Sequence, residues 1–136
     1  MYSMWSLGQK SVRSVVVMST MVSSILGRTD AKILAWDSYV LSSPLATGYH
    51  QSGWRRVIEE AFGHPTYYLV VHGQDGALQG VLPLVLLASR GFGRFLVSLP
   101  FVNYGGVVAS SAEAHRYLEA RAVEQARELN VDHIEL

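Results

Sequence analysis

The sequence contains no cysteine among its 136 residues, which excludes disulfide bonds, thiolate nucleophiles and cysteine-ligated zinc. It also lacks an excess of charge of either sign, because 11 basic residues balance 11 acidic ones. A protein dedicated to binding DNA or RNA needs a basic surface to neutralise phosphates, so this balance argues against a nucleic-acid platform. The absence of cysteine leaves the redox compartment undetermined.

Long apolar runs are missing as well, since no segment approaches the roughly 20 apolar residues that a transmembrane helix needs. The nearest approach, residues 14–27, follows Lys10 and Arg13 and is interrupted by serine and threonine. It allows three interpretations: an extension ahead of a true start at Met18 or Met21, a secretory signal, or an ordinary first strand. We predict that residues 1–20 are an extension or a disordered segment and that residues 21–136 form the domain.

The sequence does contain enough apolar residues, 49% of the total, for one domain with a core held by burial alone. Apolar residues near the helical period predict a helix over residues 30–41, with Asp30 as its N-cap. A clearer amphipathic pattern predicts a second helix over residues 54–62, which Gly63 and Pro65 end. The domain is therefore expected to open with two helices.

Strand signals dominate the middle of the sequence. Aromatic and β-branched residues predict a strand over residues 66–72, and a turn with glycine joins it to a second strand over residues 77–87. Another glycine-containing turn leads to a third strand over residues 94–99, which completes an antiparallel meander. Pro83 has no amide hydrogen to donate, so the second strand must be an edge or bulged at that position.

The last third of the sequence predicts a crossover. Ser110 and Glu113 have the spacing of a capping box that starts a helix, and Asn130 suits the left-handed position at the helix end. A strand over residues 131–136 follows, and a right-handed strand-helix-strand connection makes it parallel to the third strand. The apolar stripe of the helix consists of Leu118, Ala122, Ala126 and Leu129.

Together these elements predict an α+β fold with two N-terminal helices and a mixed sheet of three antiparallel strands, a crossover helix and a parallel strand. The last strand has an unpaired outer edge, and exposed edges are normally paired or covered, so we expect a truncated domain. The order of elements resembles the N-terminal part of the acetyltransferase fold of the GNAT superfamily.

Ordered motifs narrow the resemblance to the FemAB-like proteins, particularly those associated with exosortase and PEP-CTERM systems. The similarity spans residues 21–136. Its motifs are Trp36-Asp37-Ser38-Tyr39-Val40, Ala46-Thr47-Gly48-Tyr49-His50, Trp54, Ala61-Phe62-Gly63-His64, Gly80-Val81-Leu82-Pro83-Leu84, Ser98-Leu99-Pro100-Phe101, Asn103-Tyr104-Gly105-Gly106 and His133-Ile134-Glu135-Leu136.

This resemblance implies a cytoplasmic acyl or aminoacyl transferase built from two tandem GNAT-like domains, with the second domain missing from this chain. The implied donor is an acyl-coenzyme A or an aminoacyl-tRNA. The implied acceptor is a small molecule or a cell-envelope precursor, related in this branch to exopolysaccharide, and the fragment alone is expected to be inactive. Two alternatives stay open: a non-catalytic binding or assembly module of exopolysaccharide production, and a nonfunctional gene fragment.

Acyl transfer needs an oriented donor, hydrogen-bond donors for the developing oxyanion and a base for the attacking amine. The resemblance implies a Gln/Arg-x-x-Gly-x-Gly/Ala loop that leads directly into a helix and holds pyrophosphate. Asn103, Tyr104, Gly105 and Gly106 depart from that spacing and precede Ser110 by several residues, which puts coenzyme A binding in doubt. We predict that these four residues bind substrate from a strand-end loop. The alternative is a turn that needs positive φ, with a capping asparagine and a packing tyrosine.

His50 and Trp54 complete the predicted substrate-binding set. Their spacing places them on one helical face, where His50 is either a titratable base in a cleft or a surface or capping histidine. Trp54 is alternatively a core or interface aromatic. Ser98 shows no nucleophile-elbow pattern and is assigned no catalytic role, and no cluster of His or carboxylate residues has metal-ligand spacing. The sequence identifies no catalytic residue.

Overall fold

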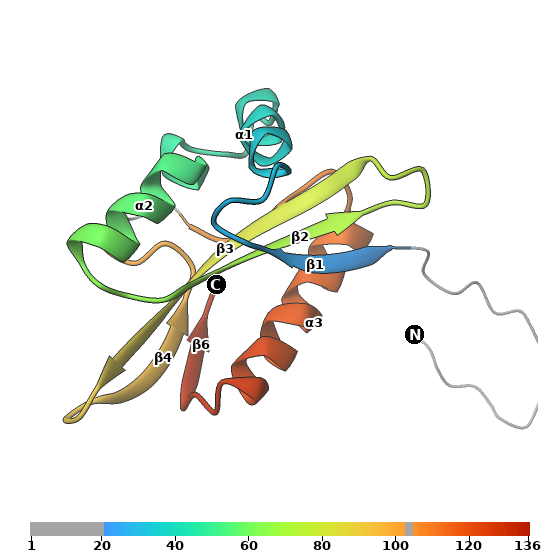
Figure 1. Cartoon of the computed structure of the whole chain (residues 1–136). Coiled ribbons are helices and arrows are strands. Elements are labelled where there is room, and N and C mark those ends of the chain that lie inside the picture. Colours follow the sequence, from blue (N-terminus) through green and yellow to red (C-terminus); the bar gives the residue numbers. More distant parts are fainter. Residues whose placement is uncertain (1–20, 103–104) are drawn as a thin grey trace, which may run out of the picture.

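The structure is a computed structural model that describes residues 21–102 and 105–136. In these ranges one mixed sheet carries the strands, and helices cover both of its faces (Figure 1). The elements in chain order are β1 (Val22–Leu26), α1 (Ile33–Ser42), the 3₁₀ turn η1 (Gly48–His50), α2 (Ser52–Ala61), β2 (Thr66–His72), β3 (Leu78–Ser89), β4 (Gly93–Val97), β5 (Val108–Ala109), α3 (Ala112–Glu128) and β6 (His133–Glu135).

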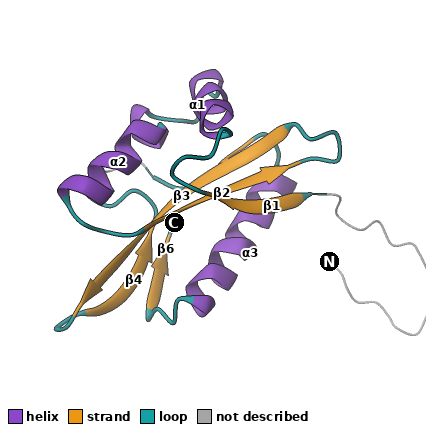
Figure 2. Ribbon diagram, viewed as in Figure 1, coloured by secondary structure: helices purple, strands orange, loops and turns teal. Residues whose placement is uncertain are grey.

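The sheet has the strand order β1-β2-β3-β4-β6, and β5 pairs with β3 off this path. Neighbouring strands are antiparallel from β1 to β4, whereas β6 runs parallel to β4 through pairs that include Leu96 with Ile134. The α3 helix lies on the crossover between these two strands (Figure 2). The predicted α+β architecture with a mixed sheet is therefore confirmed.

Two apolar layers hold the helices to the sheet, because strand side chains alternate between its faces. On one face, Leu69 and Val71 of β2 pack in a cluster with Leu118 of α3. On the other face, Tyr68 packs with Trp36 of α1, and the centroids of their stacked rings are 4.6 Å apart. Burial on both faces explains why β2 and β3 have nearly continuous apolar sequences.

Arg55 attaches α2 to the sheet. Its buried guanidinium donates to the carbonyl oxygen of Leu26 at 3.0 Å and to Oγ1 of Thr66 at 2.8 Å, and it lies 4.8 Å from the centroid of the Tyr68 ring. Glu59, one helical turn later, forms an ion pair with Arg55 at 3.2 Å. The paired carboxylate and the hydrogen bonds offset the cost of removing the cation from water.

β1 resolves part of the ambiguity in the N-terminal stretch. Val22–Leu26 is a strand antiparallel to β2, so this part of the stretch is an ordinary strand. The predicted extension, residues 1–20, lies outside the described residues. The predicted order of elements lacked this strand because Val22 and Ile25 are exposed and the segment shows no clear alternation of apolar and polar residues.

Two predicted helix starts are wrong by a few residues. Asp30 is not the N-cap of α1, since its Oδ1 accepts from the amide of Lys32 at 2.9 Å in the turn before the helix. The N-cap of α3 is Ser111 rather than Ser110, and its Oγ accepts from the amide of Ala114 at 3.1 Å. The Ser110 hydroxyl is instead 2.6 Å from a tyrosine hydroxyl of α1. Adjacent polar residues compete for the same backbone donors, and sequence spacing does not decide between them.

Pro83 lies where β3 has a partner on one side only, as predicted. On the side away from β2, β3 pairs with β5 through residues 80–81 and with β4 through residues 85–89, which leaves residues 82–84 unpaired there. Leu86 donates its amide toward the start of β2, and strand amides alternate in direction, so position 83 faces the gap. The missing amide hydrogen of Pro83 therefore leaves no partner unsatisfied.

Candidate functional site

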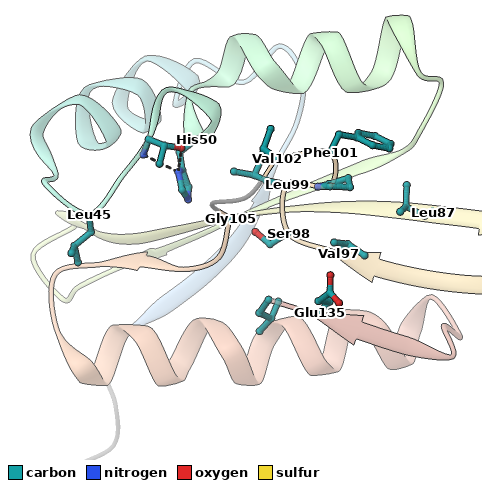
Figure 3. Close-up of a pocket in the computed structure, with 13 residues that line it drawn as sticks. Leu45, His50, Leu87, Val97, Ser98, Leu99, Phe101, Val102, Gly105 and Glu135 are labelled. Carbon is teal, nitrogen blue, oxygen red and sulfur yellow. Dashed lines mark hydrogen bonds between the residues drawn. The ribbon is translucent and has the colours of Figure 1, made fainter.

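A cavity of about 730 Å³ opens where β4 and β6 end (Figure 3). The two parallel strands point their carboxyl ends toward it, and the amide of Ser98 donates to the carbonyl oxygen of Glu135 at 2.9 Å at this end of the ladder. Open α/β sheets bind ligands outside the carboxyl ends of their strands. The volume also falls in the range of small-molecule sites, about 300 to 1,000 Å³.

The cavity wall is both polar and apolar. Its polar side chains come from Thr47, His50, Ser98 and Glu135, and no lysine or arginine is among the lining residues that the structure describes. Glu135 supplies the one side-chain carboxylate among them. The other lining residues are Leu45, Leu87, Val97, Leu99, Pro100, Phe101, Val102, Gly105 and Leu136.

The loop that follows β4 has an unusual backbone. Leu99 has a φ of 50° and Phe101 a φ of 74°, both in the left-handed region that non-glycine residues rarely occupy. Each such residue costs on the order of 1–3 kcal/mol and persists only where its surroundings hold it, which happens most often at binding sites. Here the strained loop forms one wall of the cavity.

His50 connects η1 to the glycine loop. Its Nδ1 accepts from the amide of Thr47 at 3.1 Å, and its Nε2–H donates to the carbonyl oxygen of Gly106 at 3.2 Å. Burial lowers the pKa of His50, and the hydrogen bond to Gly106 only partly opposes this shift. His50 is therefore a neutral, buried capping histidine, and acting as a base would require it to lose the bond from Thr47.

Trp54 does not share a helical face with His50, which corrects the sequence prediction. η1 ends at His50, Gln51 has an extended backbone with ψ 150°, and α2 begins only at Ser52. The ring of Trp54 packs edge-on against Tyr49 with centroids 5.2 Å apart and is not among the residues that line the cavity. The prediction that Trp54 binds substrate stays untested, and its place favours the interface interpretation.

The glycine pair forms part of the cavity wall and its support. Gly106 has a φ of 98°, donates its amide to Oγ of Ser98 at 2.8 Å and accepts from His50, so it makes the positive-φ turn that one interpretation required. Gly105 lines the cavity, and a Cβ there would overlap the carbonyl oxygen of Ser98. Asn103 and Tyr104 lie outside the described residues, so their predicted binding role stays a prediction.

Sequence reasoning missed Glu135 and underrated Ser98. Both lie at strand ends that meet only after α3 has returned the chain to the sheet, and they are 37 residues apart in sequence. The signal available in the sequence was the crossover itself, because it predicts that the carboxyl ends of the third strand and the final strand adjoin. Strand ends that adjoin across a crossover identify lining positions that single motifs do not.

A second cavity, of about 430 Å³, lies at the start of α3. Leu45 lines both cavities, and Arg116 contributes a positive charge to the second. The side chain of Ser111 already satisfies one free amide of the helix, and Glu113 places a negative charge in the first turn. This helix start is therefore less favourable to an anion than an uncapped one.

No helix in residues 21–102 and 105–136 is both long and apolar enough to cross a bilayer. In the same ranges no three metal-binding side chains of His, Asp or Glu come together in a group that could hold a metal ion.

The antiparallel strands, the α3 crossover and the parallel β4–β6 pair form the fold of the GNAT acetyltransferases. A GNAT family acetyltransferase from Staphylococcus aureus matches the chain with a TM-score of 0.60 and 14% identity, over 88% of this chain and 86% of its own. An acetyltransferase from Trypanosoma brucei matches with a TM-score of 0.51 and 16% identity, over 84% of this chain and 80% of its own. No family model and no curated protein sequence matches the chain. At these identities the likeness establishes the fold alone.

Proposed function

We propose that the chain is a domain of an acyl or aminoacyl transferase that moves an acyl group from an activated donor to an amine. The observation that carries this proposal is the cavity at the joined carboxyl ends of β4 and β6 in a GNAT fold. A carboxylate, a hydroxyl and several apolar side chains line one space there.

Glu135 is the group that we assign to accept a proton. In the reaction, the amine nitrogen forms a bond to the acyl carbon, and the bond from that carbon to the donor sulfur or oxygen breaks. The amine loses a proton to the Glu135 carboxylate, and Glu135 then passes this proton to the released thiolate or alkoxide. Ser98 holds Gly106 in place through its Oγ, so we assign it a positioning role at the cavity wall.

The FemAB-like resemblance supplies the finer part of the proposal. It supports a cell-envelope or exopolysaccharide-related acceptor, a cytoplasmic location and a second GNAT-like domain that completes the active site. The even charge balance agrees with an acceptor-side domain better than with a surface that grips tRNA. These points rest on the ordered sequence motifs.

Transfer assays on two proteins test the proposal: the 136-residue chain and an extended protein, which is this chain together with the second GNAT-like domain that we propose. We expect the extended protein to acylate an amine from an acyl-coenzyme A or an aminoacyl-tRNA, and the shorter chain to show no turnover. Failure of the extended protein to acylate any amine would refute the transferase proposal. Turnover by residues 21–136 alone would refute only the expectation that a second domain is required.

The Glu135→Gln variant tests the assigned proton acceptor. Removing a general base typically lowers kcat by about 10²- to 10⁴-fold, so we expect a loss in that range in the extended protein. Glu128→Gln, at the exposed end of α3, is the matched control and should retain full activity. An unchanged kcat in the Glu135→Gln variant would show that another group accepts the proton.

A non-catalytic binding module is the second candidate function. It is favoured by the capped start of α3 and by the glycine loop, which departs from the phosphate-binding spacing of GNAT enzymes. This candidate predicts that the extended protein binds an amine ligand without consuming any acyl donor. Calorimetric binding combined with a donor-consumption assay separates the two functions.

A further inference from the structure

We propose that the part of the acceptor that enters the larger cavity is a primary amine attached to an aromatic or similarly flat apolar group. Its binding surface is formed by Phe62, His64 and Phe101, which we name the aromatic rim. This inference deepens the proposed function and rests on it.

The aromatic rim joins the end of α2 to the strained loop after β4. The ring centroids of Phe62 and Phe101 are 4.9 Å apart with an interplanar angle of 27°, and the ring of His64 lies 6.0 Å from that of Phe101 at 24°. Of the three rings, Phe101 lines the cavity, so the aromatic rim adjoins the cavity through Phe101. A flat group in the cavity can stack on this surface.

The rim is exposed in a way that packing alone does not explain. Phe62 is 48% exposed and Phe101 60% exposed, although each ring would be more stable out of water. Phe101 also occupies the left-handed region at φ 74°, where a glycine would be relaxed. An exposed aromatic held in a strained backbone beside a cavity is typical of a binding surface.

The polar lining selects the other end of the ligand. Glu135 is the only side-chain carboxylate of the described lining, and no lysine or arginine accompanies it, so the cavity attracts an ammonium group and repels a carboxylate or phosphate. Figure 3 shows Phe101 and Leu87 at one end of the cavity, Leu45 and His50 at the other, and Glu135 between them. Because Glu135 and Phe101 line the same cavity, one ligand with an amine and a ring can contact both.

Isothermal titration calorimetry of the 136-residue chain tests this inference with 2-phenylethylamine, n-butylamine and 3-phenylpropionate. We expect 2-phenylethylamine to bind about 3- to 10-fold more tightly than n-butylamine, which is the ratio that one aromatic contact supplies. The anionic 3-phenylpropionate should bind most weakly because it faces Glu135. Equal affinity for the two amines, or tighter binding of 3-phenylpropionate, would overturn the inference.

Matched variants assign the preference to the rim. Phe62→Leu and Phe101→Leu keep apolar bulk but remove a ring, so each should abolish the preference for 2-phenylethylamine, whereas Phe101→Tyr should retain it. Phe92→Leu is the control, because Phe92 is 83% exposed in the turn between β3 and β4 and does not line the cavity. A preference that survives both rim substitutions contradicts the inference.

The same compounds separate this inference from the proposed function. If the extended protein acylates ethanolamine as readily as 2-phenylethylamine, this result contradicts the inference but still supports the transferase proposal. An extended protein that acylates neither these amines nor any other would end both.

Discussion

At the residue scale, His50 shows why the sequence alone could not decide between two roles for a histidine. Its identity and spacing are compatible with a base in a cleft or with a cap, and the choice depends on burial. His50 is buried, and the partner of its Nε2 is the carbonyl oxygen of Gly106, which lies 56 positions later in the chain. A pattern of neighbouring residues does not contain this information, so the sequence supplied the capping role only as one alternative.

The buried His50 makes the stability of the fold depend on pH. Because its folded pKa lies below the unfolded value of about 6.5, the unfolded chain takes up a proton first as the pH falls. We therefore expect the free energy of unfolding to be level above about pH 6.5 and to decrease from there toward the folded pKa. Urea titrations at several values from pH 5 to 8 measure this slope.

Substitution of His50 measures how much of the pH dependence of the free energy of unfolding comes from this residue. His50→Gln should lower the free energy of unfolding by about 1–3 kcal/mol at pH 7.5 through lost buried hydrogen bonds, and should reduce the further loss on acidification. Some slope should remain, because burial and the nearby Lys32 charge also lower the pKa of His72. His115→Gln, at a half-exposed position, is the control. An identical slope in wild type and His50→Gln would contradict this account.

The helices and strands that sequence predicted best are those whose signals are local. The turn between β2 and β3 and the amphipathic pattern of α2 each lie within a few residues, and both elements are present. β1 was predicted only as one of three alternatives, since its segment has no clear apolar alternation, and β5 was not predicted, because its two residues are too few for any period. Their existence depends on partners in β2 and β3 that are far away in sequence.

The start of α2 also depends on a residue from another element, because a side chain of α1 caps it. Oδ1 of Asp37, on α1, accepts from the amide of Ser52 at 2.7 Å, and its Oδ2 accepts from the Ser52 hydroxyl at 2.6 Å. A carboxylate in this position satisfies a free amide and interacts favourably with the helix dipole. One helix thereby caps the next.

Asp37→Ala should therefore destabilise the fold by about 0.5–2 kcal/mol, the usual cost of losing a helix cap. The midpoint of thermal unfolding, followed by circular dichroism, measures the loss. Ser38→Ala changes an exposed neighbour on α1 and should leave the midpoint almost unchanged. Equal midpoints for Asp37→Ala and Ser38→Ala would show that the cap contributes nothing.

At the scale of the whole molecule, α3 stabilises the fold by packing across one face of the sheet. Leu118 is fully buried and lies so close to Gly80 of β3 that a Cβ at position 80 would come within 2.8 Å of it. The apolar stripe predicted from sequence supplied Leu118, Ala122 and Ala126 to the core. The stripe was predictable because it repeats at the helical period. No pattern in the sequence indicated which strands it packs against.

Leu118→Ala should lower the free energy of unfolding by about 2–5 kcal/mol, as expected for a cavity in a packed core. Leu34→Ala, at a position on α1 that is 75% exposed, should change it by less than about 0.5 kcal/mol. Urea denaturation of both variants gives the comparison. A loss at Leu118 no larger than at Leu34 would mean that α3 does not hold the sheet together.

Pro83 lies between the two segments of β3 that pair with β5 and with β4 on the same side of the strand. A residue with an amide hydrogen there could donate to an approaching strand, and either β4 or β5 could then lengthen along β3 into the space between them. The chain after Val97 would then continue along the sheet, and the cavity at the end of β4 would become smaller. The missing amide hydrogen of one proline thus helps to keep the cavity beyond β4 accessible.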